Sequence, residues 1–443
     1  MGVTQELGQL VASTGHDALT PSVIERAKWA IMDGVAAMLA GSTEPASAIV
    51  TSLIQEFGGA PMATIVGRGV RTTLPWAAYV NGTMAHALDY DDISWPMGGH
   101  PTAPLLPVIL ALGEQYHVTG REALLAYVVG FEVEAKLGRA VNMVHYEKGW
   151  HPTATLGTFG AAAAAGKLLQ LNSEELTHAF GIAASEASGL KENFGTMTKP
   201  LHVGHCAKNG LVAALLAKRG FTAATEALEG HFGFGNLFVG PGVVDFTLVT
   251  KEFGNPWELA STGVVFKAYP CCGSTHAAVD AMLALRTTYG LSVEAIAGIE
   301  ARVQPNRVHV LVHPRPRTGL EAKFSLEYCV ATAALEGELR LRHFGDAWVR
   351  RPQNQALTAK TKGLVHSDAT NTHSEVTVYL QDGRVLTHRV AHAKGITTIE
   401  ELHRKYRDCA EGVLASEAIG RSLSLIEHLE EVGDLALLPQ SLG

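Results

Sequence analysis

The tetrapeptide His-Pro-Thr-Ala occurs twice in the chain, at residues 100–103 and 151–154. Because proline suits the first turn of a helix, each His is expected at or just before a helix N-terminus. The partial positive charge there disfavours an imidazolium and favours a bound carboxylate. A neutral imidazole beside such an anion site is suited to general base catalysis near pH 7. The repeat therefore predicts proton transfer by His100 and His151, with ordinary helix capping as the competing interpretation.

Residues 198–208 place a lysine next to two histidines. Lys199 precedes a proline, which predicts an extended conformation outside the following helix. A lysine displayed beside His202 could bind a carboxylate or hold a depressed pKa, and His202 is itself predicted to bind the substrate. The competing interpretation is a solvated surface lysine.

Residues 266–276 (FKAYPCCGSTH) combine a cation, hydroxyls, thiols and an imidazole ahead of a predicted helix. Lys267, Ser274 and His276 are the groups that could bind an anionic substrate. His276 could also stabilise a cysteine thiolate, as nucleophilic cysteine catalysis requires. Small residues at the start of a helix are equally expected as anion-binding structure.

Residues 86–92 (HALDYDD) contain three carboxylates next to a histidine, which is compatible with a metal site or with carboxylates that orient imidazoles. The chain has no HExxH or CxxC motif, so we expect catalysis without a metal. A metal-dependent hydrolase remains the alternative from another class of enzyme. Its ligands would come from the set His86, Asp89, Asp92, His202 and His205.

The elements that position these groups are predicted to be helices in the first part of the chain. Thr20 and Pro21 supply an N-cap and a first-turn proline, and the apolar residues that follow lie on one helix face. An unbroken alanine run at 161–165 indicates closely packed helices. Further helices are predicted at 121–141, 153–169, 173–187 and 207–219.

The pattern changes after about residue 266. Residues 299–303 alternate as a strand, and 375–380 with 384–390 form a strand, tight turn and strand around Asp382-Gly383. From residue 399 the periodicity is helical again.

The predicted fold is therefore mainly α with an α+β domain. A large all-helical domain (1–265 and 396–443) carries a smaller α+β lid domain (266–395) inserted before the C-terminal helices. The cleft between the two domains is the default place for an active site.

Composition restricts the partners. The 443 residues are 47% hydrophobic and 18% charged, which is typical of a globular protein. The net charge is -8 and no basic stripe is present, so nucleic acid is not an expected partner. An anionic substrate would need local Lys, Arg or His residues that overrule this overall charge.

Five cysteines, two of them adjacent, indicate a reduced compartment rather than a disulfide framework. Residues 1–10 show no signal peptide, and the apolar runs are too short to span a bilayer. These features predict a cytoplasmic protein that does not associate with membranes.

Six segments together resemble the MmgE/PrpD family. They are residues 85–93, 149–167, 198–211, 266–277, 321–329 and 376–385, and they run in the order found in that family. The resemblance covers most of the chain. It implies a helical domain built from the N-terminal part and the C-terminal tail, a smaller α+β domain, a homodimer, and catalysis without metal or organic cofactor.

The resemblance also implies a reaction and a site. Characterised members include 2-methylcitrate dehydratase, cis-aconitate decarboxylase and iminodisuccinate epimerase, which transfer a proton beside a carboxylate of a small di- or tricarboxylic acid. The site residues carried over by motif are Asp89, His100, His151, Lys199, Lys267 and Tyr328. His151 would be the general acid or base, Tyr328 a second proton donor, and Asp89 an orienting carboxylate.

Among these reactions the sequence favours epimerisation, because the chain is shorter than is usual for the dehydratases and decarboxylases of the family. A dehydratase or decarboxylase is the alternative within the family. A third possibility is a non-catalytic helical binding protein whose histidines cap helices.

Overall fold

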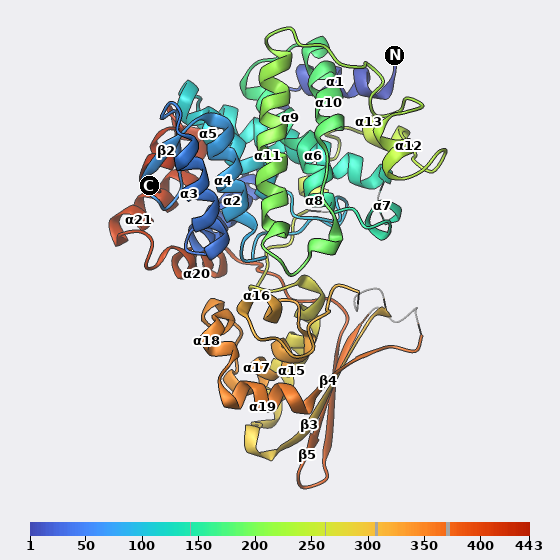
Figure 1. Cartoon of the computed structure of the whole chain (residues 1–443), viewed down its shortest axis with the longest axis vertical. Helices are drawn as coiled ribbons and strands as arrows, with labels where there is room; N and C mark the ends of the chain where they lie inside the picture. The colour runs from blue at the N-terminus through green and yellow to red at the C-terminus, as the bar shows by residue number, and fades with distance from the viewer. Residues whose placement is uncertain (142, 262, 306–308, 369–372) are drawn as a thin grey trace. The chain divides into compact units, whose positions relative to one another are not determined.

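The computed structural model describes residues 1–141, 143–261, 263–305, 309–368 and 373–443, and the chain divides into two compact units (Figure 1). Unit 1 comprises Met1–Asn193, Met197–Phe266 and Thr397–Gly443, and unit 2 comprises Phe194–Thr196 and Lys267–Ile396. Among the described residues, unit 1 is helical apart from one short hairpin, whereas unit 2 combines helices with a four-stranded sheet. The predicted fold class, mainly α with an α+β domain before the C-terminal helices, is confirmed.

Unit 1 is a bundle whose long helices surround an alanine-rich centre. Its helices are α1 (Val3–Ser13), α2 (Pro21–Ser42), α3 (Pro45–Phe57), α4 (Leu74–His86), α5 (Thr102–Tyr116), α6 (Gly120–Val141), α7 (Val144–Glu147), α8 (Pro152–Thr155), α9 (Gly157–Leu168), α10 (Ser173–Glu186), α11 (Thr198–Ala217), α12 (Phe234–Phe238), α13 (Thr247–Thr250), α14 (Glu258–Ser261), α20 (Ile399–Ala410), α21 (Ser416–Glu427) and α22 (Leu437–Ser441). Its hairpin pairs β1 (Ala63–Ile65) with β2 (Val70–Thr72).

The start of α2 follows the predicted pattern. The Thr20 hydroxyl accepts a hydrogen bond from the Val23 amide at 3.4 Å, and Pro21 occupies the first helical position. Every residue from Ala30 to Ser42 is buried. A helix buried around most of its circumference belongs in the interior of a helical bundle.

Small residues let the central helices approach one another closely. A Cβ atom on Gly204 of α11 would lie 2.1 Å from the carbonyl oxygen of Tyr79 in α4, and one on Gly82 would lie 2.9 Å from Gly204 Cα. Only glycine at both positions permits this crossing. The close contact brings the end of α4 beside the start of α11, and both helices carry predicted site residues. The alanine run at 161–165 is fully buried in α9, as expected for such packing.

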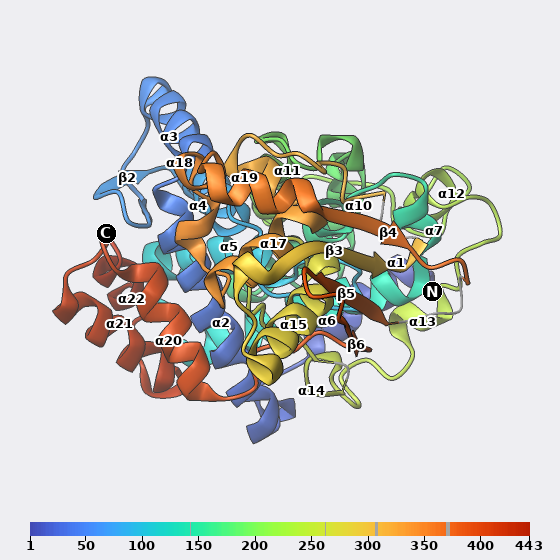
Figure 2. The same cartoon turned by 90° about the horizontal axis from the view of Figure 1, so that it is seen from below.

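Unit 2 contains a sheet in the order β4-β3-β5-β6, in which β3 and β4 are parallel and the other pairs are antiparallel. Helices α15 and α17 pack on it (Figure 2). The strands are β3 (Ile296–Val303), β4 (Thr361–Val365), β5 (Ser374–Leu380) and β6 (Val385–Val390). The helices are α15 (Gly273–Tyr289), α16 (Gly319–Ala322), α17 (Leu326–Glu336), α18 (Asp346–Val349) and α19 (Pro352–Lys360).

The β5–β6 hairpin is the one that the sequence predicts. Val376, Val378 and Leu380 are buried, whereas the intervening Tyr379 is exposed. Gly383 has a φ of 88° in the turn, a conformation that glycine adopts without strain.

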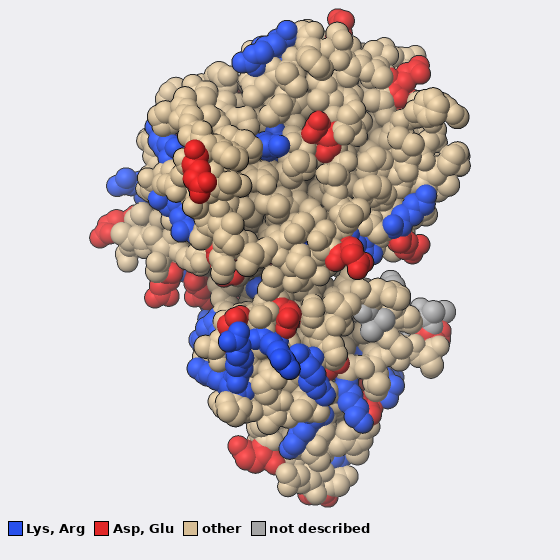
Figure 3. Space-filling model, in the orientation of Figure 1, with Lys and Arg blue, Asp and Glu red and all other residues tan. Residues whose placement is uncertain are grey.

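The two units differ in charge. Residues 267–396 hold 16 Lys and Arg and 11 Asp and Glu, so unit 2 is basic although the whole chain carries a net charge of -8. Figure 3 shows Lys and Arg side chains gathered on the surface of this unit. No helix in the described part of the chain has both the length and the apolar character needed to cross a membrane.

Candidate functional site

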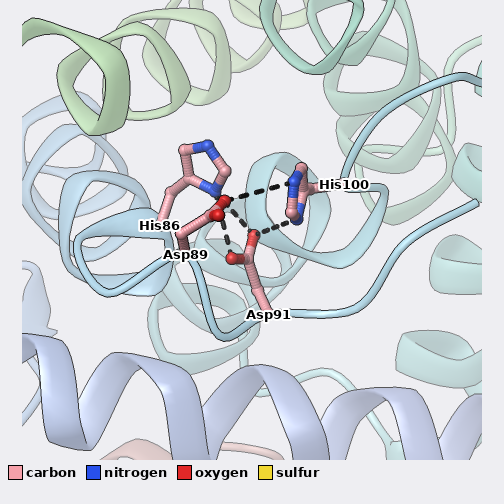
Figure 4. A group of neighbouring side chains, drawn as sticks. All are labelled: His86, Asp89, Asp91 and His100. Carbon is pink, nitrogen blue, oxygen red and sulfur yellow. Dashed lines mark hydrogen bonds and ion pairs between the residues drawn. The ribbon is translucent and has the colours of Figure 1, made fainter. Parts of the chain in front are cut away.

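The turn after α4 gathers four of the polar side chains of unit 1 (Figure 4). His86 ends α4, Asp89 and Asp91 belong to the turn, and His100 lies just before α5. One ligand atom from each of the four lies within 4.8 Å of the others. His100 contacts both acids, with Nε2 3.5 Å from Asp89 Oδ1 and Nδ1 3.2 Å from Asp91 Oδ2. We call these four residues the His–Asp cluster.

The pair of His86 and Asp91 is fully buried in the His–Asp cluster. His86 Nδ1 lies 2.8 Å from Asp91 Oδ2, so the imidazole donates to the carboxylate. Burial lowers the pKa of His86 to about 4 although Asp91 opposes this shift. Burial acts to raise the pKa of Asp91, but His100 and His86 outweigh it and hold that pKa well below its usual range. The result is a neutral His86 beside an ionised Asp91.

The other ring nitrogen of His86 is a buried acceptor that lacks a donor within the described part of the chain. His86 Nε2 is buried and has no hydrogen-bond partner among the residues that the structure describes. With the proton on Nδ1, the Nε2 atom carries a lone pair. A buried acceptor without a donor lowers the stability of the fold by about 1–3 kcal/mol. A ligand or a water molecule that donates a hydrogen bond to it would remove this cost.

Asp89 links the His–Asp cluster to α11. Lys199 Nζ donates to Asp89 Oδ1 at 2.6 Å, and both side chains are nearly inaccessible to solvent. Asp89 has a φ of 51°, the left-handed conformation, which costs a non-glycine residue about 1–3 kcal/mol. Surrounding contacts must therefore hold this residue in place.

The prediction that Lys199 lies outside the following helix is wrong. Helix α11 begins at Thr198, nine residues before the predicted 207–219, and Lys199 is in its first turn. Pro200 is tolerated there because an amide in the first turn has no intrahelical acceptor to lose. The buried ion pair with Asp89 offsets the steric bias that a proline imposes on the residue before it.

The second His-Pro-Thr-Ala step lies beside the cluster. His151 is the N-cap residue of α8 and is 2% exposed. Its ring centroid is 5.6 Å from that of His86, and its Nδ1 lies 3.2 Å from His202 Nδ1. Burial, followed by the charges of His86 and Lys199, lowers the pKa of His151 well below its usual range.

His202 is also held neutral, whereas His205 has a different neighbourhood. Burial is the largest cause that lowers the pKa of His202 to about 4. His205 Nε2 instead contacts the Asn209 side-chain amide at 2.9 Å, one turn further along α11. His86, His100, His151 and His202 thus form a group of imidazoles with a lysine and two carboxylates.

Four of the predicted site residues of unit 1 meet here: Asp89, His100, His151 and Lys199, with His202 as a fifth neighbour. The group is completed by Asp91, which was not predicted, and by His86, which was predicted only as a metal ligand in the hydrolase alternative. The signal for them was present in the segment 86–92, where a histidine precedes three carboxylates. Spacing alone did not indicate which carboxylate the histidine contacts.

Asp92, a proposed ligand in the hydrolase alternative, faces another set of partners. Its carboxylate accepts from the Thr102 hydroxyl at 2.5 Å, and burial raises its pKa well above its usual range. The His–Asp cluster itself offers two imidazoles and two carboxylates, a ligand type that suits transition metals. A cation already contacts the cluster, since the Lys199 ammonium is 2.6 Å from Asp89 Oδ1.

In unit 2 the predicted binding residues lie near the start of α15. Lys267 is 1% exposed, Ser274 is half-buried in the first turn, and His276 Nε2 lies 3.1 Å from the Cys271 carbonyl oxygen. The Cys271 thiol is 3.2 Å from the Thr275 hydroxyl. The roles of Lys267, Ser274 and His276 in substrate binding stay predictions.

Tyr328 is packed in the core of unit 2. Its ring is fully buried on α17, and its hydroxyl donates to the His343 carbonyl. Burial raises the pKa of this phenol to about 12. The hydroxyl already has an acceptor inside the unit, so the described contacts favour a structural contribution, and its role as a proton donor stays a prediction.

Comparison with known families gives two matches along the chain. Residues 5–247 match the MmgE/PrpD N-terminal domain, and residues 269–431 match the MmgE/PrpD C-terminal domain. The chain belongs to the MmgE/PrpD family. The resemblance seen in the sequence motifs is thereby confirmed.

Several curated relatives of this MmgE/PrpD chain are decarboxylases. The human cis-aconitate decarboxylase is 30% identical over 449 residues, which cover 96% of this chain and 90% of that protein. The mouse cis-aconitate decarboxylase is 29% identical, with 99% and 93% covered. The cis-aconitate decarboxylase of Aspergillus terreus is 26% identical, with 100% and 96% covered.

These relatives bear on the preferred reaction. Epimerisation was favoured because the chain is shorter than the decarboxylases of the MmgE/PrpD family, yet the alignment spans 90% of the human decarboxylase. The difference in length therefore does not separate this chain from that group. The comparisons support the alternative, a lyase, better than the epimerase.

Proposed function

We propose that the protein is a lyase that removes CO2 from a small tricarboxylic acid, with cis-aconitate as the first substrate to test, and that it needs no metal or organic cofactor. The observation that carries the proposal is the buried group of imidazoles, carboxylates and Lys199 in a chain of this family. The aligned relatives are cis-aconitate decarboxylases, which supports decarboxylation over epimerisation or dehydration.

The proposed chemistry requires a proton donor and a positive charge. The bond between carbon and one carboxyl group breaks, CO2 leaves, and the electron pair passes into the double bond conjugated with a remaining carboxylate. A carbon of that system then takes up one proton, so each turnover consumes a proton and releases one CO2. Cations placed where this negative charge develops stabilise the transition state.

His100 is the proposed proton donor. Its two ring nitrogens lie 3.5 and 3.2 Å from the carboxylates of Asp89 and Asp91. A carboxylate beside an imidazole orients the ring and stabilises the imidazolium from which a proton is delivered. The Lys199 ammonium is the proposed stabiliser of the developing negative charge.

His151 and His86 are the proposed orienting groups. Both have pKa values lowered by burial, so each is a neutral imidazole at pH 7. A neutral imidazole can donate or accept one hydrogen bond without adding a charge. The buried lone pair of His86 Nε2 is a ready acceptor for a protonated group of a ligand.

The charge of unit 2 is compatible with an anionic substrate. Its excess of Lys and Arg over Asp and Glu is the local positive charge that the acidic chain as a whole lacks. Substrate contacts by Lys267, Ser274 and His276, a homodimeric assembly and a cytoplasmic location belong to the same proposal.

The deciding experiment is incubation of the purified protein with cis-aconitate and a panel of other di- and tricarboxylates in D2O, followed by NMR. We expect loss of CO2 and one deuterium in the product. Exchange of a C–H proton without net conversion would identify an epimerase, and loss or gain of water a dehydratase. No change with any acid in the panel would overturn the proposal of carbon-acid chemistry.

A further inference from the structure

The turn that carries Asp89 and Asp91 is attached to the C-terminal part of unit 1 by one buried lysine. Lys405 lies on α20 and is 3% exposed. Its Nζ atom donates to the carbonyl oxygen of Tyr90 at 2.6 Å and lies 3.8 Å from the centroid of the Tyr90 ring. Tyr90 is the residue between the two aspartates of the His–Asp cluster.

The same ammonium has a second partner on α2. Lys405 Nζ lies 2.7 Å from Asp33 Oδ1, and Asp33 is a fully buried residue of α2. Hydrogen bonds from a charged donor are about twice as strong as those between neutral groups, and a buried ammonium cannot turn to water instead. Lys405 therefore joins α2, α20 and the turn at one point.

The turn needs such a restraint. Asp89 has the left-handed φ of 51°, and its amide donates a hydrogen bond to the His86 carbonyl at 3.2 Å. The Lys199 ammonium holds the carboxylate of Asp89. Lys405 holds the backbone carbonyl of Tyr90, the next residue. Asp89, with its strained backbone, is therefore restrained by two lysines, one at its side chain and one at the following carbonyl.

We propose that Lys405 is a positioning residue of the active site: through the Tyr90 carbonyl and ring it fixes the Asp89–Asp91 turn in the geometry that His86, His100 and Lys199 require. This inference rests on the proposed function, because the cluster is taken to be the reacting site. Lys405 acts through Tyr90 and Asp33 and is not itself a catalytic residue.

Lys28 offers a matched control. It also joins α2 to the C-terminal part of the chain, with Nζ 2.8 Å from the Glu427 carbonyl and 2.9 Å from Glu430 Oε1. None of these partners belongs to the His–Asp cluster. Lys28→Met therefore removes a partly exposed attachment between the same parts of the chain without altering the turn.

The test compares the double variant Asp33→Asn/Lys405→Met with Lys28→Met. The double change removes both buried charges together, which avoids an uncompensated carboxylate. Circular dichroism and the Tm establish that the variant is folded. We expect kcat to fall by about 100-fold, the effect of an error of about 1 Å in the position of catalytic groups, with KM close to that of the unchanged protein. Lys28→Met should leave kcat unchanged.

A second readout does not depend on turnover. The imidazole NMR signals of His86 and His100, assigned by His→Gln variants, should shift in the double variant and stay in place in Lys28→Met. Unchanged signals and unchanged kcat in the folded double variant would overturn the proposal, and so would equal losses in the two variants. If the unchanged protein converts no carboxylate, the proposed function fails, and the NMR signals still decide whether Lys405 positions the turn.

Discussion

The two His-Pro-Thr-Ala steps share a sequence but differ in their surroundings. His100 precedes the long helix α5, and its ring contacts the carboxylates of Asp89 and Asp91. His151 caps the four-residue helix α8, and its ring contacts His202. In one copy of the tetrapeptide the imidazole faces carboxylates, and in the other it faces the neutral imidazole of His202. The local sequence sets the place of each His at a helix start, and its neighbours set its chemistry.

The cause of the neutral state also differs from the predicted one. The helix N-terminus was expected to disfavour an imidazolium at both positions. For His151 the largest cause of the lowered pKa is burial, and the neighbouring His and Lys residues add to it. The helix dipole is not needed to explain this shift.

The largest expected effect is that of His100→Gln. Removal of the proposed proton donor should lower kcat by about 10²- to 10⁴-fold, the usual contribution of general acid catalysis, with a smaller change in KM. Steady-state kinetics on the substrate identified by NMR would measure both constants. His117→Gln is the matched control, because His117 also contacts an aspartate, Asp434, at 2.9 Å but is exposed. A His100→Gln enzyme with normal kcat would reverse the roles assigned to the two repeats.

His151→Gln should have a smaller effect. If His151 orients the substrate as a neutral hydrogen-bonding group, its loss removes about one hydrogen bond, or roughly tenfold in kcat/KM. The same kinetic assay applies. A loss as large as that of His100→Gln, together with a loss of deuterium incorporation into the product, would identify His151 as the proton donor instead.

The acid sensitivity of folding provides a third and weaker comparison. The pKa of His151 is lower in the folded state than the usual value of 6.5, so the unfolded state binds more protons. The contribution of the neutral His151 to the free energy of unfolding is complete above about pH 6.5. It is lost as the pH falls toward the pKa of His151 in the folded state. The Tm of the unchanged protein should therefore drop between pH 7 and 5, and His151→Gln should flatten that drop. An identical pH profile for the two proteins would contradict a buried neutral His151.

Removal of metal ions should have no effect. The His–Asp cluster contains four groups that could hold a metal ion, but Lys199 supplies a cation to it. Exhaustive chelation is expected to leave kcat unchanged, with activity measured before and after added Zn²⁺. Loss of activity on chelation and recovery with metal would support the hydrolase alternative and would give His100 the role of a ligand.

Much of the fold followed from patterns that extend over only a few residues. The capped start of α2, the alternating strand β5 and the Asp382-Gly383 turn are local features, because propensity, capping and turn chemistry act between near neighbours. The start of α11 was missed for the same reason. The steric preference of a residue before proline predicted an extended Lys199. The buried ion pair of Lys199 with Asp89, which is distant in the sequence, outweighs that preference.

The sequence by itself determined the helical and mixed parts of the chain, the family, and the segments that carry the polar site residues. Only the tertiary structure decided that His86 pairs with Asp91, that Lys199 pairs with Asp89, and that Lys405 holds the turn between the two acids. These pairs join positions on different helices, brought together by the close crossing of α4 and α11 and the return of α20 to α2. Pairing and protonation depend on distance and burial in three dimensions, which spacing along the chain does not specify.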